Sequence, residues 1–173
     1  EDTSETILPN EHININPFYS SHITDNFFWP IPGFSKITSY FGKRNKPTSG
    51  ASSFHTGIDI PAPHGTNIYS ILTGKVTFIG FNGANGHTIK ISSGNYTIIY
   101  AHVSPNYIIS INDTIQKGQL IGHVGPKYIS DVINNPYKDS SGKTTNGAST
   151  GCHLHLGIKK DGIAVNPLNY FSF

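Results

Sequence analysis

The sequence predicts an all-β domain, and two observations lead to that prediction. Short runs of β-branched and aromatic residues alternate with glycine and proline along most of the chain, a spacing typical of many short strands joined by turns. The 18 glycines and 11 prolines oppose long helices, and no sustained helical period is visible. We therefore expect a small antiparallel β-sheet domain.

Residues 1–26 differ from the rest of the chain. They are rich in Asn and Ser, contain Pro9 and Pro17, and show no hydrophobic period, so we interpret them as a flexible linker or stalk. The packed domain is predicted to span residues 27–173. The 173 residues suffice to bury a core, and a single cysteine, Cys152, excludes an intramolecular disulfide.

The predicted strands are runs of Val, Ile, Thr, Tyr and Phe between turn residues. They are His55–Ile60, Ile37–Tyr40, Ile68–Ile71, Val76–Ile79, Thr88–Ile91, Tyr96–Tyr100, Ile108–Ile111, Gln119–Val124 and His153–Ile158. Residues 126–150 form the longest polar, turn-rich interval, which predicts a loop.

Charge and hydropathy argue against two classes of function. The formal net charge is +2, only 13% of residues are charged, and no basic stripe is present, so we expect no nucleic-acid partner. No apolar run approaches the ~20 residues that a membrane-spanning helix needs, so the sequence does not predict such a helix. The chain has nine histidines, which is many for its size, and histidine is the commonest metal ligand.

Two predicted strands carry histidines at alternating positions, and side chains in a strand alternate between its faces. His55, Gly57 and Asp59 share one face of the first strand. His153, His155 and Gly157 share one face of the second. The isoleucines and leucines between them would face the core. We expect the glycines to leave room for a metal, a water molecule or a substrate backbone.

Two imidazoles and one carboxylate from these strands would make a three-ligand zinc site. Three protein ligands leave the fourth tetrahedral position open, as in catalytic zinc sites. A third candidate is His102, at the end of the strand Tyr96–Tyr100, where functional side chains often lie. The histidines that do not bind zinc would take up a proton or stabilise an oxyanion.

The other histidines and the cysteine have simpler interpretations. We place outside the site the linker residues His12 and His22, the turn residue His64, the hairpin residue His87 and His123. Cys152 could act as the nucleophile of a Cys-His amidase. However, strand alternation turns it away from its histidine neighbours, so we expect a small buried hydrophobic residue that does not touch the chemistry.

The sequence resembles the lysostaphin-type (LytM-like) zinc metalloendopeptidases of bacterial cell walls. His55-x-x-x-Asp59 and His153-x-His155 match the two signatures of this family. Further blocks follow in family order from about residue 29 to residue 170. These blocks are Trp29–Gly33, Ile37–Arg44, Gly65–Tyr69, Gly74–Val76, Tyr100–His102, Lys117–Gly122, Ser149–Gly151 and Asn166–Leu168.

The resemblance implies a role for each histidine of the constellation. His55, Asp59 and His155 would bind one zinc ion per chain. His153 would be the general base, and His102 would orient water or stabilise the oxyanion. The implied fold is a small antiparallel sheet of the duplicated-hybrid-motif type, with zinc on the floor of a groove. Residues 126–148 resemble an insertion that could wall one side of this groove.

The resemblance implies a zinc endopeptidase that hydrolyses peptide stems or cross-bridges of peptidoglycan. Its expected location is extracellular, in the cell wall or at the outer face of the bacterial membrane, where the stalk would suit a tether through an upstream segment. The alternative is a non-catalytic scaffold or interaction module at the cell envelope that retains zinc. The presence of His102 and His153 favours the enzyme, because a scaffold does not need them.

Overall fold

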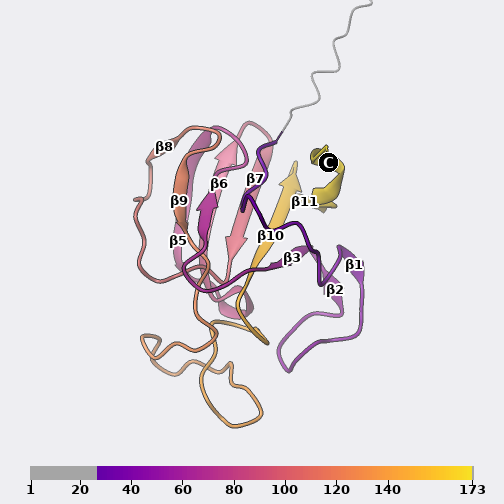
Figure 1. Cartoon of the computed structure of the whole chain (residues 1–173), viewed down its shortest axis with the longest axis vertical. Helices are drawn as coiled ribbons and strands as arrows, with labels where there is room; N and C mark the ends of the chain where they lie inside the picture. Colours follow the sequence, from indigo (N-terminus) through magenta and orange to yellow (C-terminus); the bar gives the residue numbers. More distant parts are fainter. Residues whose placement is uncertain (1–26, 173) are drawn as a thin grey trace, which may run out of the picture.

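Antiparallel strands dominate the computed structural model, which describes residues 27–172 (Figure 1). Within these residues there is no α-helix, and the all-β prediction is confirmed. The described part of the chain has no helix long and apolar enough to cross a membrane. The predicted linker, residues 1–26, lies outside the described residues.

One seven-stranded sheet forms the body of the fold, in the order β11–β10–β7–β6–β5–β8, with β3 also pairing with β10. Its strands are β3 (Gly57–Pro61), β5 (Gly74–Phe81), β6 (His87–Ser93), β7 (Tyr96–Ala101), β8 (Thr114–Ile115), β10 (His153–Lys160) and β11 (Ile163–Val165). Two-stranded ribbons and 3-10 turns complete it: β1 (Gly42–Lys43) with β2 (Phe54–His55), β4 (Asn67–Tyr69) with β9 (Leu120–His123), η1 (Gly83–Asn85) and η2 (Pro167–Tyr170).

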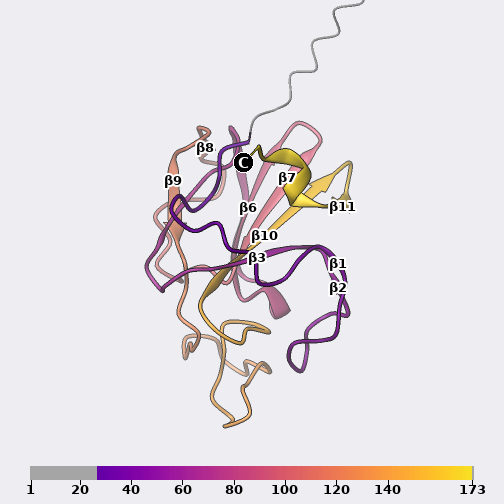
Figure 2. The same ribbon diagram turned by 45° about the vertical axis from the view of Figure 1, so that its right-hand side comes forward.

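The core lies between the large sheet and the β4–β9 ribbon, which covers it (Figure 2). Ile68 of β4 and Ile121 of β9 are fully buried, as is Ile89 of β6. A Cβ placed at Gly122 would lie 3.2 Å from Cδ1 of Ile89, so ribbon and sheet are in close contact. Burial of each such side chain stabilises the fold by about 1.5–3 kcal/mol.

Three predicted strands need correction. Ile108–Ile111 is not a strand, and both terminal isoleucines are about half exposed. Ile37–Tyr40 contributes only an isolated bridge, between Ser39 and Asp59. The predicted strand His55–Ile60 is split at Thr56, which is exposed instead of facing the core. The split arises because β2 pairs with β1, whereas β3 pairs with β10.

The register of three neighbouring strands brings the histidine motifs together. Asp59 of β3 lies directly opposite His155 of β10, and His155 lies opposite Ala101 of β7 on its other side. Directly opposed residues in an antiparallel pair project to the same face. His102 follows β7 immediately, so it emerges beside His153 at the same end of the sheet.

Candidate metal centre

Two imidazoles and a carboxylate meet on the floor of a groove. Nε2 of His55 lies 2.9 Å from Nδ1 of His155 and 3.0 Å from Oδ1 of Asp59. Nδ1 of His155 lies 2.9 Å from the same carboxylate oxygen. Three atoms that can each offer a lone pair thus form a triangle. The structure brings together the three residues to which the family resemblance assigns the metal.

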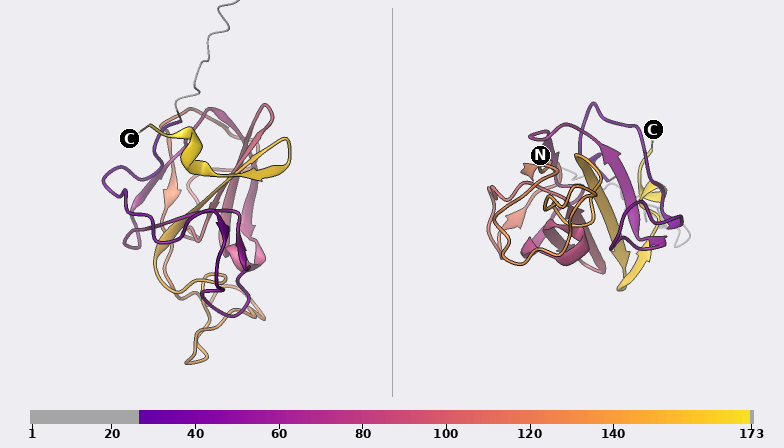
Figure 3. Two further views of the ribbon diagram at one scale, coloured as in Figure 1. Left: turned by 90° about the vertical axis from the view of Figure 1, so that its right-hand side faces the viewer. Right: turned by 90° about the horizontal axis from the view of Figure 1, so that it is seen from below.

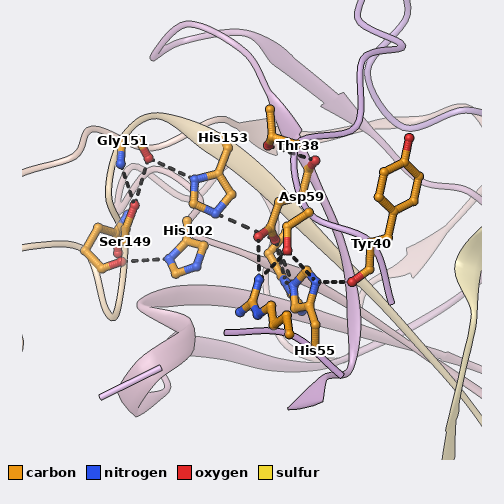
Figure 4. Close-up of polar contacts among 12 residues, drawn as sticks. Thr38, Tyr40, His55, Asp59, His102, Ser149, Gly151 and His153 are labelled. Atoms are coloured by element: carbon orange, nitrogen blue, oxygen red, sulfur yellow. Dashed lines mark hydrogen bonds and ion pairs between the residues drawn. The ribbon is translucent and has the colours of Figure 1, made fainter. Parts of the chain in front are cut away.

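This donor set fits a divalent cation. Nδ1 of His55 lies 3.0 Å from the carbonyl oxygen of Tyr40, which can only accept, so His55 carries its proton there and turns the Nε2 lone pair toward the triangle (Figure 4). The Asp59 carboxylate also only accepts. A single proton on His155 Nδ1 cannot satisfy three close contacts, whereas a cation such as zinc would accept all three lone pairs.

The glycines on the two polar strand faces make room for an imidazole. A Cβ at Gly57 would lie 2.8 Å from Nε2 of His155 and 2.3 Å from the carbonyl oxygen of Leu156. Gly157 pairs with Gly57 across β3 and β10. The alternation of the two motifs predicts that this space admits a metal, a water molecule or a substrate backbone. Instead, the His155 ring fills it and presents Nδ1 to Asp59.

A second layer of contacts holds two of these residues. Nη1 of Arg44 donates to Oδ2 of Asp59 at 3.3 Å and also to Oγ of Ser39. That hydroxyl lies 3.2 Å from Nδ1 of His55. The guanidinium therefore occupies one carboxylate oxygen and leaves the other to the imidazoles. No sequence motif predicts Arg44 or Ser39 in the site, because Ser39 reaches it through its isolated bridge to Asp59 and Arg44 through the pairing of β1 with β2.

The folded site favours the protonation states that bind a cation. Burial alone would raise the pKa of Asp59, but its close contacts with the His155 and His55 imidazoles and the electrostatic influence of His155 and His153 outweigh burial and hold the pKa well below its usual value. Burial lowers the pKa of His155, and lowers the pKa of His102 to about 3. Near neutral pH the metal-free site therefore holds an ionised Asp59 carboxylate next to the neutral imidazoles of His155 and His102.

His153 and His102 lie beside the triangle, with ring centroids 4.6 Å apart, and Figure 4 shows both on the side of Asp59 away from His55. Nε2 of His153 is 3.8 Å from Oδ1 of Asp59. Nδ1 of His153 lies 2.9 Å from the backbone carbonyl oxygen of Gly151. Nδ1 of His102 lies 2.7 Å from the backbone carbonyl oxygen of Asn146. Both histidines thus keep the Nε2 lone pair available to accept a proton.

The groove over these residues has a volume of about 610 Å³ and a mixed polar and apolar lining. Its walls are parts of residues 44–56, η1 and residues 148–152. Of the insertion, only Ala148 lines the groove among the described residues, so the expected wall is formed only at its end. The remainder of the insertion lies at the same end of the molecule as loop 44–53 (Figure 3), where a Cβ at Gly50 would come 2.9 Å from the Tyr137 ring.

Cys152 has two environments. Its half-buried side chain packs against the hydrophobic core cluster, as the strand alternation predicts. It also lines the groove, which the sequence analysis did not expect. Among the described residues, the group that could hold a metal ion consists of His55, Asp59 and His155, and it does not include the Cys152 thiol.

The other described histidines, His64, His87 and His123, do not line the groove. His12 and His22 lie outside the described residues. His64 is exposed in a turn, and His123 ends β9. His87 is buried at the start of β6, with Nδ1 2.8 Å from the Tyr107 hydroxyl and Nε2 3.0 Å from Oδ2 of Asp131. His87 therefore connects the sheet to the insertion through Asp131. The interpretation of His87 as a hairpin residue did not include this contact.

The metal-free protein is expected to lose stability as the pH falls below about 6.5, the ordinary pKa of histidine. Between that pH and about 3, the unfolded chain binds a proton at His102 that the folded chain excludes. Each such proton lowers the free energy of unfolding by up to about 1.4 kcal/mol per pH unit. The lowered pKa of His155 adds to the effect in the same direction.

Urea unfolding in the presence of a chelator, at several values between pH 8 and pH 5, measures this loss. Near pH 8 these two histidines add almost nothing to the pH dependence of the unfolding free energy, because both are then neutral in the folded and the unfolded chain. H102Q should show a shallower decline than the wild type. A wild-type stability that stays constant down to pH 5 would contradict the assigned protonation states.

The chain is similar in sequence to known peptidases. Residues 53–135 match the model of Peptidase family M23. The chain is 31% identical over 137 residues to DD-carboxypeptidase/endopeptidase Mpg of Neisseria meningitidis, covering 79% of this chain and 27% of Mpg. It is 29% identical over 136 residues to peptidoglycan DD-endopeptidase ShyC of Vibrio cholerae, covering 78% and 27%. The chain thus spans about a quarter of the length of these relatives.

Solved structures agree as well. A mutant of the catalytic domain of EnpA, a prophage-encoded M23 protein from Enterococcus faecalis, superposes with a TM-score of 0.59 at 28% identity, covering 85% of this chain and 97% of that chain. The fold is therefore that of the LytM-like M23 peptidases, to which this chain is similar. The match of residues 53–135 to Peptidase family M23, together with these structures, supports a LytM-like family for this chain.

Proposed function

We propose that this chain is a zinc-dependent endopeptidase that hydrolyses peptide stems or cross-bridges of bacterial peptidoglycan, with residues 27–173 as its catalytic domain. The observation that carries the proposal is the triangle of His55, Asp59 and His155, flanked by two imidazoles with available Nε2 atoms. The family match and the names of Mpg and ShyC support this substrate class. Peptidoglycan as substrate implies an envelope location, outside the cytoplasmic membrane.

In this proposal His55 Nε2, Asp59 Oδ1 and His155 Nδ1 hold one zinc ion. A bound zinc ion lowers the pKa of a water ligand and polarises the scissile carbonyl group. Arg44 keeps Oδ2 of Asp59 engaged, so that Oδ1 faces the two imidazoles. The Tyr40 carbonyl keeps His55 in the tautomer whose Nε2 can bind a metal.

The two flanking histidines would handle the proton and the negative charge. His153 Nε2 accepts the proton of the attacking water and later delivers it to the leaving amine. His102 orients the water or stabilises the developing oxyanion. His102 is neutral at physiological pH, since burial lowers its pKa to about 3. An extended peptide would lie in the open groove, whose mixed lining suits both backbone and side-chain contacts.

Removal of the metal tests the proposal. The protein as purified is expected to contain about one zinc per chain and to clear a suspension of purified cell walls. A chelator should abolish the clearing and added zinc should restore it. Elemental analysis and turbidity measure both quantities, and mass spectrometry of the released fragments identifies the bond.

Two further outcomes discriminate the alternatives. Zinc at full occupancy with no cleavage of any wall type would support a scaffold that retains the metal. Clearing that resists the chelator but stops after iodoacetamide treatment would indicate a thiol nucleophile at Cys152. Failure to bind zinc after reloading would contradict the proposed centre itself.

A further inference from the structure

His102 has a constrained backbone. It directly follows β7 with φ of 57°, in the left-handed region that residues other than glycine rarely adopt. Such a conformation persists only where its surroundings determine it. The His102 N–H donates to the carbonyl of Asn85 at 2.9 Å, and its carbonyl accepts from the N–H of Gly125 at 2.9 Å. The chain therefore leaves the strand direction here, and the imidazole lines the groove.

The imidazole itself is oriented from a distant segment. Nδ1 of His102 donates to the backbone carbonyl of Asn146 at 2.7 Å. This contact decides which ring nitrogen carries the proton, because a carbonyl oxygen can only accept. Asn146 is fully buried and lies near the end of the insertion, 44 residues further along the chain.

The side chain of Asn146 anchors that carbonyl to the sheet. Its Oδ1 accepts from the N–H of His87, the first residue of β6, at 2.7 Å. Its Nδ2 donates to the carbonyl of Val103, the residue after His102, at 3.0 Å. Its N–H donates to the carbonyl of Lys127 at 2.9 Å. One side-chain amide thus links the insertion to the start of β6 and to the segment that directly follows β7.

The space around this amide is closed by glycines. A Cβ at Gly86 would come 2.3 Å from Oδ1 of Asn146. A Cβ at Gly147 would come 2.3 Å from the N atom of Gly86. Both glycines also have positive φ values, 62° and 70°, so the approach of the two segments requires glycine. The Asn146 carbonyl therefore has little freedom to move relative to the His102 ring.

We propose that Asn146 is a positioning residue for His102. Its side-chain amide locks the end of the insertion onto β6 and Val103, and its carbonyl thereby holds His102 with the proton on Nδ1 and Nε2 toward the groove. The inference rests on the proposed function, in which His102 Nε2 contacts the water or the oxyanion. It assigns a catalytic contribution to the insertion, although only Ala148 of that segment lines the groove.

The pair Asn146→Asp and Asn135→Asp tests this proposal. Asn135 is a matched control, because it is also buried in the insertion and uses its amide in the same way. Its Nδ2 donates to the Thr145 carbonyl at 2.8 Å, and its Oδ1 accepts from the Tyr137 N–H at 3.0 Å. Both variants replace an amide donor with a carboxylate oxygen facing a carbonyl, but only Asn146 contacts His102.

Asn146→Asp is expected to lower kcat for wall hydrolysis by at least about tenfold, with KM and zinc content within about twofold of the wild type. Asn135→Asp should leave kcat within about twofold, whatever its effect on thermal unfolding. An equal loss of kcat in both variants, or no loss in Asn146→Asp, would overturn the proposal.

A second measurement does not depend on activity or on the stability of an Asn146 variant. Long-range ¹H–¹⁵N NMR spectra of the zinc-loaded wild type report the tautomer of each histidine, with H102Q used to assign the His102 signals. We expect the His102 proton on Nδ1. A proton on Nε2 would overturn the proposal. If the wild type hydrolysed no wall at all, the proposed function would fail while this tautomer result still stood.

Discussion

Asp59→Asn is expected to remove zinc binding and wall hydrolysis together. Asp59 is the carboxylate of the triangle, and its Oδ1 lies 2.9 Å from His155 Nδ1 and 3.0 Å from His55 Nε2. Asparagine has the same size, but it lacks the negative charge and offers a weaker ligand. Loss of an outer contact to a metal ligand costs roughly 10–100-fold in metal affinity, so loss of the ligand's charge should cost more than about 100-fold.

The metal affinity of this variant is measured by competition with a chromogenic zinc chelator, and hydrolysis by turbidity. Asp139→Asn is the matched control. Asp139 accepts hydrogen bonds from Tyr128 and Ser141 within the insertion and does not line the groove. The control should keep wild-type zinc affinity. Zinc bound by Asp59→Asn as tightly as by the wild type would rule out Asp59 as a ligand.

His153→Ala is expected to keep its zinc and lose most of its activity. His153 lies outside the triangle, with Nε2 3.8 Å from Oδ1 of Asp59, so its removal leaves the three donor atoms in place. General base catalysis contributes about 10²–10⁴-fold to a rate. We therefore expect kcat to fall by about that factor while KM changes by only a few fold.

Steady-state kinetics on a defined wall fragment, with zinc content measured on the same samples, checks this expectation. His64→Ala is the control, because His64 is an exposed histidine in a turn away from the groove. Unchanged hydrolysis by a fully zinc-loaded His153→Ala would refute the role of His153 as base. Loss of zinc in this variant would show that His153 is a ligand, and the ligand set would then need revision.

Local patterns correctly predicted the all-β fold class and the strand that carries His153 and His155. Glycine and proline divide the chain into short β-branched runs, and this composition leaves few alternatives to an antiparallel sheet. Alternation along His153–Ile158 correctly predicted β10, with Leu154, Leu156 and Ile158 fully buried. These features could be predicted from the sequence because successive side chains in a strand point to opposite faces of the sheet.

Local patterns failed where one predicted strand pairs with two different partners and where a predicted strand has no partner. The strand predicted at His55–Ile60 breaks at Thr56, because its two halves pair with different strands. The run Ile108–Ile111 has strand composition but finds no strand partner in the described chain. Pairing is decided by residues far away in the sequence, which no local period reports.

The sequence by itself determined an all-β domain, the types of chemical group available, and two motifs whose side chains share a face within each strand. Only the tertiary structure decided that Asp59 and His155 are directly opposed, that the His155 ring fills the space over Gly57, and that Arg44 and Asn146 hold the site in place. The physical reason is that these contacts join distant segments: Arg44 and Asp59 are 15 residues apart along the chain, His102 and Asn146 are 44 apart, and Asp59 and His155 are 96 apart. Their geometry depends on strand register and on loop closure, and neither is encoded in the spacing of residues along one strand.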